Sequence, residues 1–153
     1  MPWLLKTEPD VFSFQDLLSA PRQTTLWEGV RNYQARNFMR DMRVGETVLI
    51  YHSSTAITGI AGLARVVRAS YPDPTQFDPE SHYFDPKATP NAPRWDAIDV
   101  MGTVGITGPS ALPRFVTLLE LKAEPALAAM RLLQKGNRLS VLPVTEAHLD
   151  VIL

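Results

Sequence analysis

"WEGVRNYQARNFMRDMRVGETVLIYHS", residues 27–53, changes its hydrophobic period part-way along, and this change decides the fold class. Apolar residues first recur at i, i+3, i+4 and i+7, which predicts an amphipathic helix over 34–42. The residues that keep this spacing are Ala35, Phe38, Met39 and Met42. After the turn residue Gly45, the mostly apolar run "ETVLIYHS" predicts a strand over 46–53. The stretch therefore contains one helix followed by one strand.

Short apolar runs and helix caps flank this stretch on both sides. Ser13, with Asp16 three residues on, is typical of a capping box. Strands are expected over 3–6, 59–71, 94–107 and 138–145, and helices after Ser13, over 118–133 and after Thr145. Strands in the middle with helices at both ends favour an α+β fold, a curved and mostly antiparallel sheet or small barrel with helices packed outside. Without an internal repeat or a second boundary in the sequence, residues 1–153 are expected to form one domain.

The segment 72–94 is rich in proline, with six of the thirteen prolines of the chain. That density is incompatible with a long helix or a central strand, because proline lacks the backbone donor. The segment is therefore either a long ordered excursion or a flexible flap. Its aromatic residues Phe77, Tyr83 and Phe84 favour a loop that packs onto the body of the protein.

Composition indicates a globular chain whose charges are segregated. Of the 153 residues, 45% are apolar and 20% are charged, and the formal net charge is -1. That balance argues against a strongly cationic protein that coats nucleic acid. Residues 22–43 nevertheless carry a net charge of +3, and residues 72–99 carry -4. One basic and one acidic surface are expected.

Several kinds of chemistry find no motif in the sequence. The absence of cysteine excludes disulfides, thiolate zinc sites and cysteine nucleophiles. The three histidines show no HxxxH or HxH spacing, so neither a metal site nor a cofactor is expected. The sequence also lacks GxGxxG, GxxxxGK[ST] and GxSxG. Because the N-terminus does not resemble a signal peptide and no apolar run approaches about 20 residues, we expect a cytoplasmic protein, nuclear in a eukaryote, without membrane contact.

What remains is a set of aromatic residues that stand beside polar residues rather than inside apolar runs. The aromatics are Trp27, Tyr33, Tyr51 and Trp95, and the neighbouring polar residues are Arg31, Asn32, Arg36 and Asn37. Flat aromatic faces stack on nucleic-acid bases, at about 1–3 kcal/mol per base. Arginine and asparagine bind phosphates and base edges. A single base extruded into a pocket uses both kinds of contact.

The same residues also admit structural interpretations. Trp27 or Trp95 can belong to the core, and Asn32 can be the N-cap of the helix that follows. Arg40 and Arg43 are expected to be solvated charges on that helix. Tyr51 and His52 can instead be interior residues. Arg138 can instead form a structural ion pair with one of the acidic residues.

The ordered motifs of the chain resemble those of the EVE domain family, a PUA-like group. The resemblance rests on "WLLKTEP", "FSFQDL", the stretch 27–53, "GIAGLARVVRASYPDPTQFDP", "YFDPK", "RW" and "RLSVLPVT", which cover essentially the whole chain. One departure is Thr7, where the family commonly has serine; both carry a hydroxyl. The resemblance implies a PUA-like fold, a bent and mostly antiparallel β-barrel flanked by helices. It also implies binding of modified bases, modified cytosines above all, in DNA or RNA.

Carried over to this sequence, the resemblance implies a base-binding pocket between the barrel and the helix that begins near Gln34. Its residues are Lys6, Thr7, Glu8, Trp27, Arg31, Asn32, Tyr33, Tyr51, His52, Ser53, Arg138, Leu139 and Ser140, and phosphates are expected at Arg31, Arg36 and Asn37. The leading hypothesis is a non-catalytic reader of a modified base. Two alternatives stay open. One is a nucleotide-processing enzyme with Glu8 or His52 as acid–base, and the other is a small-molecule or protein-interaction module that uses the loop 72–94.

Overall fold

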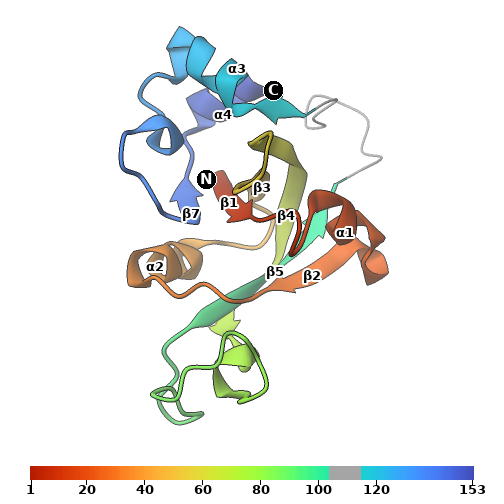
Figure 1. The fold of residues 1–153 in the computed structure, drawn as a ribbon, viewed down its shortest axis with the longest axis vertical. Coiled ribbons are helices and arrows are strands. Elements are labelled where there is room, and N and C mark those ends of the chain that lie inside the picture. The colour runs from red at the N-terminus through yellow and green to blue at the C-terminus, as the bar shows by residue number, and fades with distance from the viewer. Residues whose placement is uncertain (104–114) are drawn as a thin grey trace.

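The computed structural model describes residues 1–103 and 115–153, and an open seven-stranded sheet runs through them (Figure 1). The strands are β1 (Trp3–Thr7), β2 (Thr24–Trp27), β3 (Thr47–His52), β4 (Gly59–Pro72), β5 (Asp96–Gly102), β6 (Val116–Thr117) and β7 (Val141–Pro143). Their order is β2-β5-β4-β3-β1-β7, with β6 pairing to β4. The α+β class is confirmed. Within the described residues the edge strands β2 and β7 do not pair, so the expected barrel is not closed.

All three expected caps begin helices as predicted, and the helix over 34–42 is confirmed with a shift of one residue. The helices are α1 (Phe14–Ser19), α2 (Tyr33–Asp41), α3 (Leu118–Ala123) and α4 (Glu146–Ile152). Asn32 caps α2 and accepts a hydrogen bond from the backbone of Ala35 at 3.0 Å. Ser13 forms the predicted capping box of α1, and Thr145 caps α4. Ala35, Met39 and Met42 are buried, with Phe38 packed against them.

The expected helix over 118–133 is wrong in its length. α3 ends at Ala123, and Pro125 then begins a short 3-10 turn, because its ring removes the donor that a continuing helix needs. Leu127 and Met130 are still buried as their spacing predicted. The expected strands at 94–107 and 138–145 are also shorter, since β5 ends at Gly102 and β7 has three residues; positions 104–107 lie outside the described residues.

Successive side chains of β1 point to opposite faces of the sheet and separate two apolar clusters. Trp3 and Leu5 belong to the cluster that α1 and α2 cover, whereas Leu4 belongs to the cluster beneath α3 and α4. Figure 1 shows the first pair of helices flanking the middle of the molecule and the second pair at one end. The sheet therefore carries a core on each face.

β1 pairs in parallel with β3, and this is the feature that positions the site. Every other strand pair in the described residues is antiparallel. Parallel strands end at the same edge of a sheet, so the residues after Thr7 and His52 lie together; Ser53 donates a backbone hydrogen bond to Thr7 at 2.9 Å. On the other side of β1, the backbone of Lys6 donates to Ser140 at 2.9 Å.

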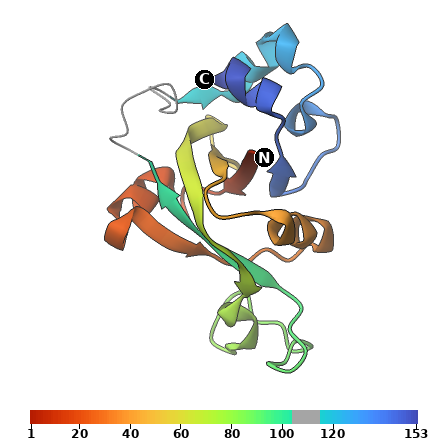
Figure 2. The same cartoon turned by 180° about the vertical axis from the view of Figure 1, so that it is seen from behind.

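The proline-rich loop forms a lobe beyond the ends of β4 and β5, which run side by side along the molecule (Figure 2). Its packing onto the body is confirmed, since Asp73 and Gln76 have no exposed surface. The Gln76 amide donates to the carbonyl oxygens of Asp73 and Trp95 and accepts from the backbone of Arg94 and Trp95, all at 2.8–2.9 Å. The loop is thus an ordered excursion held by buried polar contacts.

Candidate functional site

A cavity of about 580 Å³ lies where the ends of β1 and β3 face β2 and the proline-rich loop. It is lined by residues 6–8, 11–12, 25–30, 53–54, 138 and 140, together with Tyr83. Its volume is within the range of roughly 300–1,000 Å³ that small-molecule sites occupy. α2 contributes no lining residue, so this cavity does not lie against the helix beside which the sequence predicted the pocket.

Two aromatic rings form an apolar wall of the cavity. Trp27, the last residue of β2, is 8% exposed and also belongs to the core cluster beneath α1 and α2. Phe12 packs edge-to-face against it, with ring centroids 6.2 Å apart and planes at 87°. The two interpretations of Trp27, core residue and pocket wall, are therefore compatible.

Hydroxyl groups from three predicted residues also line the cavity. The Thr7 hydroxyl donates to the carbonyl oxygen of Phe12 at 2.7 Å, which fixes the turn that follows β1. The Ser53 hydroxyl is 3.4 Å from the Thr7 carbonyl oxygen, a long contact that leaves it able to turn toward a ligand. Ser140 lies beside Lys6 through their backbone pairing.

Lys6 and Arg138, here called the cationic rim, supply the positive charge of the cavity. Neither forms an ion pair with any residue in 1–103 or 115–153, so the structural ion pair considered for Arg138 is absent there. Lys6 is half-buried, and this burial lowers the pKa of its ammonium. Its nitrogen lies 6.0 Å from the centroid of the Tyr51 ring.

Two carboxyl groups face the same cavity. Glu8 is exposed, whereas Glu28 is half-buried. Burial raises the pKa of Glu28, and the negative charge of Asp73 raises it further, while a hydrogen bond from its own backbone and the charge of Arg31 act in the opposite direction. The cavity therefore holds two cations and two acids of unequal exposure.

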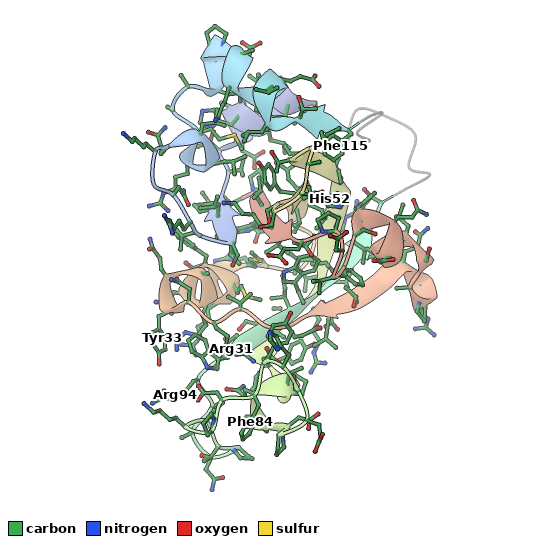
Figure 3. All side chains as sticks on the ribbon, in the orientation of Figure 1. Arg31, Tyr33, His52, Phe84, Arg94 and Phe115 are labelled. Carbon is green, nitrogen blue, oxygen red and sulfur yellow. The ribbon has the colours of Figure 1, made fainter. Side chains whose placement is uncertain are left out.

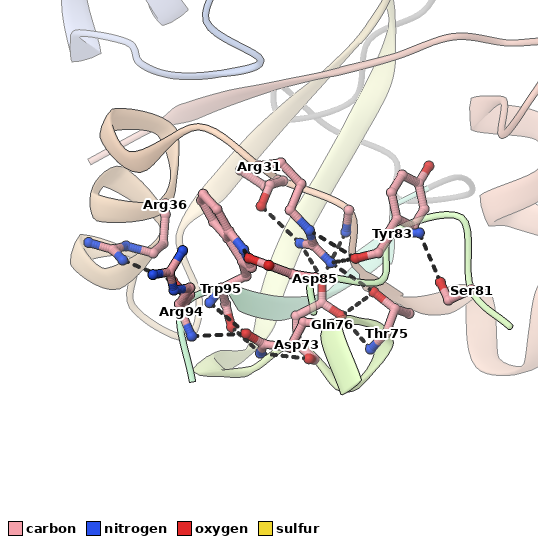
Figure 4. Close-up of polar contacts among 12 residues, drawn as sticks. Arg31, Arg36, Asp73, Thr75, Gln76, Ser81, Tyr83, Asp85, Arg94 and Trp95 are labelled. Carbon is pink, nitrogen blue, oxygen red and sulfur yellow. Dashed lines mark hydrogen bonds and ion pairs between the residues drawn. The ribbon is translucent and has the colours of Figure 1, made fainter. Parts of the chain in front are cut away.

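Arg31, predicted to contact both base and phosphate, is surrounded by acceptors of the protein itself (Figure 4). Its guanidinium donates to the Tyr83 carbonyl oxygen at 2.7 and 3.1 Å, to Asp73 at 3.0 Å and to Thr75 at 3.1 Å. A further hydrogen bond of 3.0 Å reaches the carbonyl oxygen of Val30. We call Arg31, Asp73, Thr75 and Tyr83 the Arg31 clasp, since they tie the proline-rich loop to the end of β2.

The residues that follow Arg31 lie outside the cavity, on a face beside the loop (Figure 3). Tyr33 stacks on Trp95 with ring centroids 4.7 Å apart and planes at 23°. The guanidinium of Arg36 lies 4.7 Å from the Tyr33 centroid and donates to Asn37 and to the Arg94 carbonyl oxygen. Asn32 is occupied as the helix cap. Trp95 is 6% exposed and belongs to the interior.

Three more predicted residues do not line the cavity. Tyr51 is 4% exposed in the cluster on the opposite face of the sheet, and Leu139 packs against both clusters. His52 is half-buried, and its Nε2 accepts a hydrogen bond from the backbone of Phe14 at 3.0 Å. Burial lowers the pKa of His52, which favours the neutral ring that this hydrogen bond requires. The interior alternative is confirmed for Tyr51.

Arg40 is exposed on α2, as expected, but it also forms an ion pair that the sequence did not predict. Its guanidinium donates to both carboxylate oxygens of Asp96, at 2.9 and 3.1 Å. Asp96 begins β5 and is 8% exposed, so its charge requires a partner. Arg43 is exposed and forms no ion pair within the described residues.

Comparisons with known proteins identify the family. The sequence model of the EVE domain matches residues 2–153. The chain belongs to the EVE domain family. Human thymocyte nuclear protein 1 is 38% identical to this chain over an alignment of 167 residues. The alignment covers 99% of this chain and 72% of that protein.

Solved EVE structures share the fold of this EVE domain, which is therefore PUA-like. A protein from Pseudomonas putida is 48% identical with a TM-score of 0.90, and the match covers 99% of this chain and 97% of that one. Human THYN1 protein, solved in complex with DNA containing 5-methylcytosine, is 39% identical with a TM-score of 0.89. That match covers 99% of this chain and 94% of the human one.

Several lining residues of this EVE domain were not predicted from the sequence, among them Val11, Phe12, Leu26, Glu28, Ser54 and Tyr83. The one residue that could have pointed to the contact with Tyr83 is Gly29, which has a φ of +84°. A side chain there would meet the Tyr83 ring, because a Cβ would lie 2.6 Å from it. A glycine allows a neighbour to approach the backbone closely, and the loop is rich in aromatic residues. Together they indicate a close contact at Gly29, but they do not identify Tyr83 as the residue that makes it.

The described residues hold no group of three or more histidine, aspartate or glutamate side chains placed to bind a metal ion. None of the helices in the same residues has both the length and the apolar character needed to cross a membrane.

Proposed function

We propose that this EVE domain is a non-catalytic module that binds nucleic acid carrying 5-methylcytosine, with the modified base extruded into the cavity beside Trp27. The cavity carries the proposal, because it combines an aromatic wall with hydroxyl groups and a cationic rim. Human THYN1 protein, of the same family, has been solved with DNA that contains this base.

The energies of base extrusion fit such a site. Unstacking and unpairing one base costs a few kcal/mol. Stacking against an aromatic side chain returns about 1–3 kcal/mol, and hydrogen bonds to the base edge add to it. Phe12 and Trp27 provide the aromatic surface, and Thr7 and Ser53 provide the polar groups.

Discrimination of the methyl group follows from the apolar part of the lining. Val11, Phe12 and Leu26 offer carbon surface to the 5-methyl group. Burying one methyl or methylene contributes about 0.8 kcal/mol, which corresponds to about a fourfold preference for methylated over unmethylated cytosine. The exocyclic amine of cytosine is a hydrogen-bond donor, and the carboxylate of Glu8 or Glu28 can accept a hydrogen bond from it.

The cationic rim sets the electrostatic share of binding. Lys6 and Arg138 have no acidic partner among the described residues, so both are available to phosphates. Two phosphate contacts give a slope of about -2 in a plot of log affinity against log salt concentration. Non-specific binding is therefore expected to be weak at physiological salt.

The test is a binding titration by fluorescence polarisation. The probes are a duplex with one central 5-methylcytosine, the same duplex with cytosine, and the matching pair in single-stranded RNA. Trp27→Phe, Lys6→Met and Arg138→Ala are expected to weaken binding, whereas Arg43→Ala, at an exposed position just beyond the end of α2, serves as the control. Equal affinity for the methylated and unmethylated members of both pairs would refute the proposal.

Trp27→Phe is preferred to Trp27→Ala because Trp27 is also part of the core. Truncation of a buried tryptophan to alanine costs about 3–5 kcal/mol of stability, so lost binding would not be separable from lost folding. Each variant is therefore compared at a temperature well below its own melting midpoint, measured by circular dichroism.

The same reagents separate binding from catalysis. Glu8 is the exposed carboxylate of the cavity, whereas the Nε2 lone pair of His52 is engaged by Phe14. Mass spectrometry of the methylated probe after long incubation is expected to show no change in mass. A product formed by the wild type and not by Glu8→Gln would support the enzyme alternative instead.

A further inference from the structure

A second hollow, of about 420 Å³, adjoins the cavity described above. It shares Gly29 and Tyr83 with that cavity, so the two spaces lie next to each other with Tyr83 between them. Its remaining lining comes from Arg31 and from the turn His82–Asp85, with Trp95 beneath. Nothing in the proposed function uses this hollow.

The hollow presents aromatic surface to solvent. Phe84 is 39% exposed, although a ring of this size is usually covered. His82 is also exposed and packs edge-to-face against Tyr83, with ring centroids 5.4 Å apart and planes at 71°. Exposed flat rings beside a nucleic-acid site are stacking platforms, because every base has a π-face.

The charges of the hollow are balanced and already engaged. Arg31 is bound in its clasp to Asp73. Asp85 accepts hydrogen bonds from the indole nitrogen of Trp95 at 2.7 Å and from the backbone of Lys87 at 2.9 Å. One engaged cation and one engaged anion favour a neutral, planar occupant over a phosphate group.

The wall between the two spaces is fixed before any ligand arrives. The Tyr83 carbonyl oxygen accepts two hydrogen bonds from Arg31, at 2.7 and 3.1 Å, and the Tyr83 ring lies against Gly29. The backbone of Gly29 in turn donates to Asp73 at 2.9 Å. A preorganised wall of this kind saves the cost of ordering a loop on binding.

We propose that the second hollow holds the base of the nucleotide next to the extruded one, stacked on Phe84. The occupant is therefore a neighbouring base of the same strand, and the ligand of the whole site is a strand that spans both spaces. This inference rests on the proposed function, since the neighbouring base reaches the hollow only when its partner occupies the cavity. It extends that function from a single-base pocket to a two-nucleotide site.

The test compares a mononucleotide with a strand. The probes are 5-methyl-2'-deoxycytidine monophosphate and a single-stranded pentanucleotide with 5-methylcytosine at its centre. Phe84→Ala is expected to weaken pentanucleotide binding by about 5- to 150-fold, the loss of one stacked base. Its affinity for the mononucleotide should stay within about twofold of the wild type, because one apolar substitution outside the cavity leaves the cavity contacts in place. Phe84→Trp should retain strand binding, and Leu119→Ala, 80% exposed on α3, is the matched control.

A second probe identifies the occupant. In it, the two nucleotides that flank the 5-methylcytosine are abasic. The wild type is expected to bind this strand as weakly as Phe84→Ala binds the intact strand, and the variant should lose nothing further with the abasic strand. The inference would be overturned, while the reader proposal stands, if Phe84→Ala bound the intact strand as tightly as the wild type does. It would also be overturned if the losses from Phe84→Ala and from the abasic strand simply added together. A different result would separate the two proposals. If the wild type binds methylated and unmethylated strands equally well, and Phe84→Ala weakens the binding of both by the same factor, the base subsite stands and the reader proposal is overturned.

Discussion

Arg138 lines the first cavity and Arg31 lines the hollow beside it, and the two arginines behave as different kinds of residue. The Arg31 guanidinium meets five acceptor contacts within the protein, and Asp73, its ionic partner, is fully buried. Arg138 is exposed and has no ion-pair partner in the described residues. The difference teaches that proximity to a site does not make an arginine a ligand contact, because what matters is how many of its donors the fold leaves unused.

Breaking the Arg31 clasp is expected to have the largest effect on stability. Arg31→Ala leaves the buried carboxylate of Asp73 without its ionic partner, and removal of one member of such a pair costs about 3–5 kcal/mol. The free energy of unfolding from urea denaturation should fall by that amount. Arg43→Ala, which removes an exposed arginine, should stay within about 0.5 kcal/mol of the wild type. Similar values for the two variants would show that the clasp is not structural.

A substitution in the wall between the cavity and the second hollow is expected to have the second-largest effect on stability. Gly29→Ala forces a side chain onto a φ of +84° and into the Tyr83 ring, and overpacking of this kind costs about 1–3 kcal/mol. Gly45→Ala is the matched control, because Gly45 has a φ of +94° with nothing within 4 Å of a Cβ. The difference between their melting temperatures isolates the contact with Tyr83 from backbone strain. An equal loss in both would assign the whole effect to strain.

The cationic rim should respond in binding rather than in stability. Arg138→Ala is expected to reduce the salt slope of DNA binding by about one, the contribution of one phosphate contact. Its free energy of unfolding should change by less than about 0.5 kcal/mol, since the residue is exposed. Affinities measured from 50 to 300 mM salt give the slope, and an unchanged slope would remove Arg138 from the rim.

The smallest expected effect is the pH dependence that Glu28 contributes. Its pKa is raised in the folded protein by burial, so the folded state favours the protonated carboxyl. The corresponding stability is complete below the ordinary glutamate pKa and is lost as pH rises through the raised pKa. Glu28→Gln stays neutral and lacks this loss. The free energy of unfolding of the wild type should therefore fall relative to Glu28→Gln across that window, and parallel pH profiles would contradict the assignment.

The parts of the fold that were predictable depend on neighbours in sequence. The capping box at Ser13, the helix after Asn32 and the apolar run of β3 each follow from residues a few positions apart, and all three are present. Local patterns determine elements because caps, periodicity and turns act over one or two turns of chain.

What was missed depends on partners far along the chain. Nothing near Arg31 in the sequence identifies Asp73, which lies 42 residues later, as its partner. β2 was not predicted, because four residues of mixed exposure have no clear alternation. The position of the cavity follows from the parallel pairing of β1 with β3, and the short apolar runs of the two strands do not by themselves determine the pairing direction.

That parallel pair has a thermodynamic consequence for the whole domain. The lining of the cavity is drawn from segments that begin at Lys6 and end at Ser140, so the cavity exists only when the N-terminal strand, the middle of the chain and the last strand have all assembled. A ligand there binds the folded state and not the unfolded chain, and at 100 times its dissociation constant it adds about 2.7 kcal/mol to the unfolding free energy. Its occupancy is thus readable from the melting temperature of distant elements such as α4, without a label near the site.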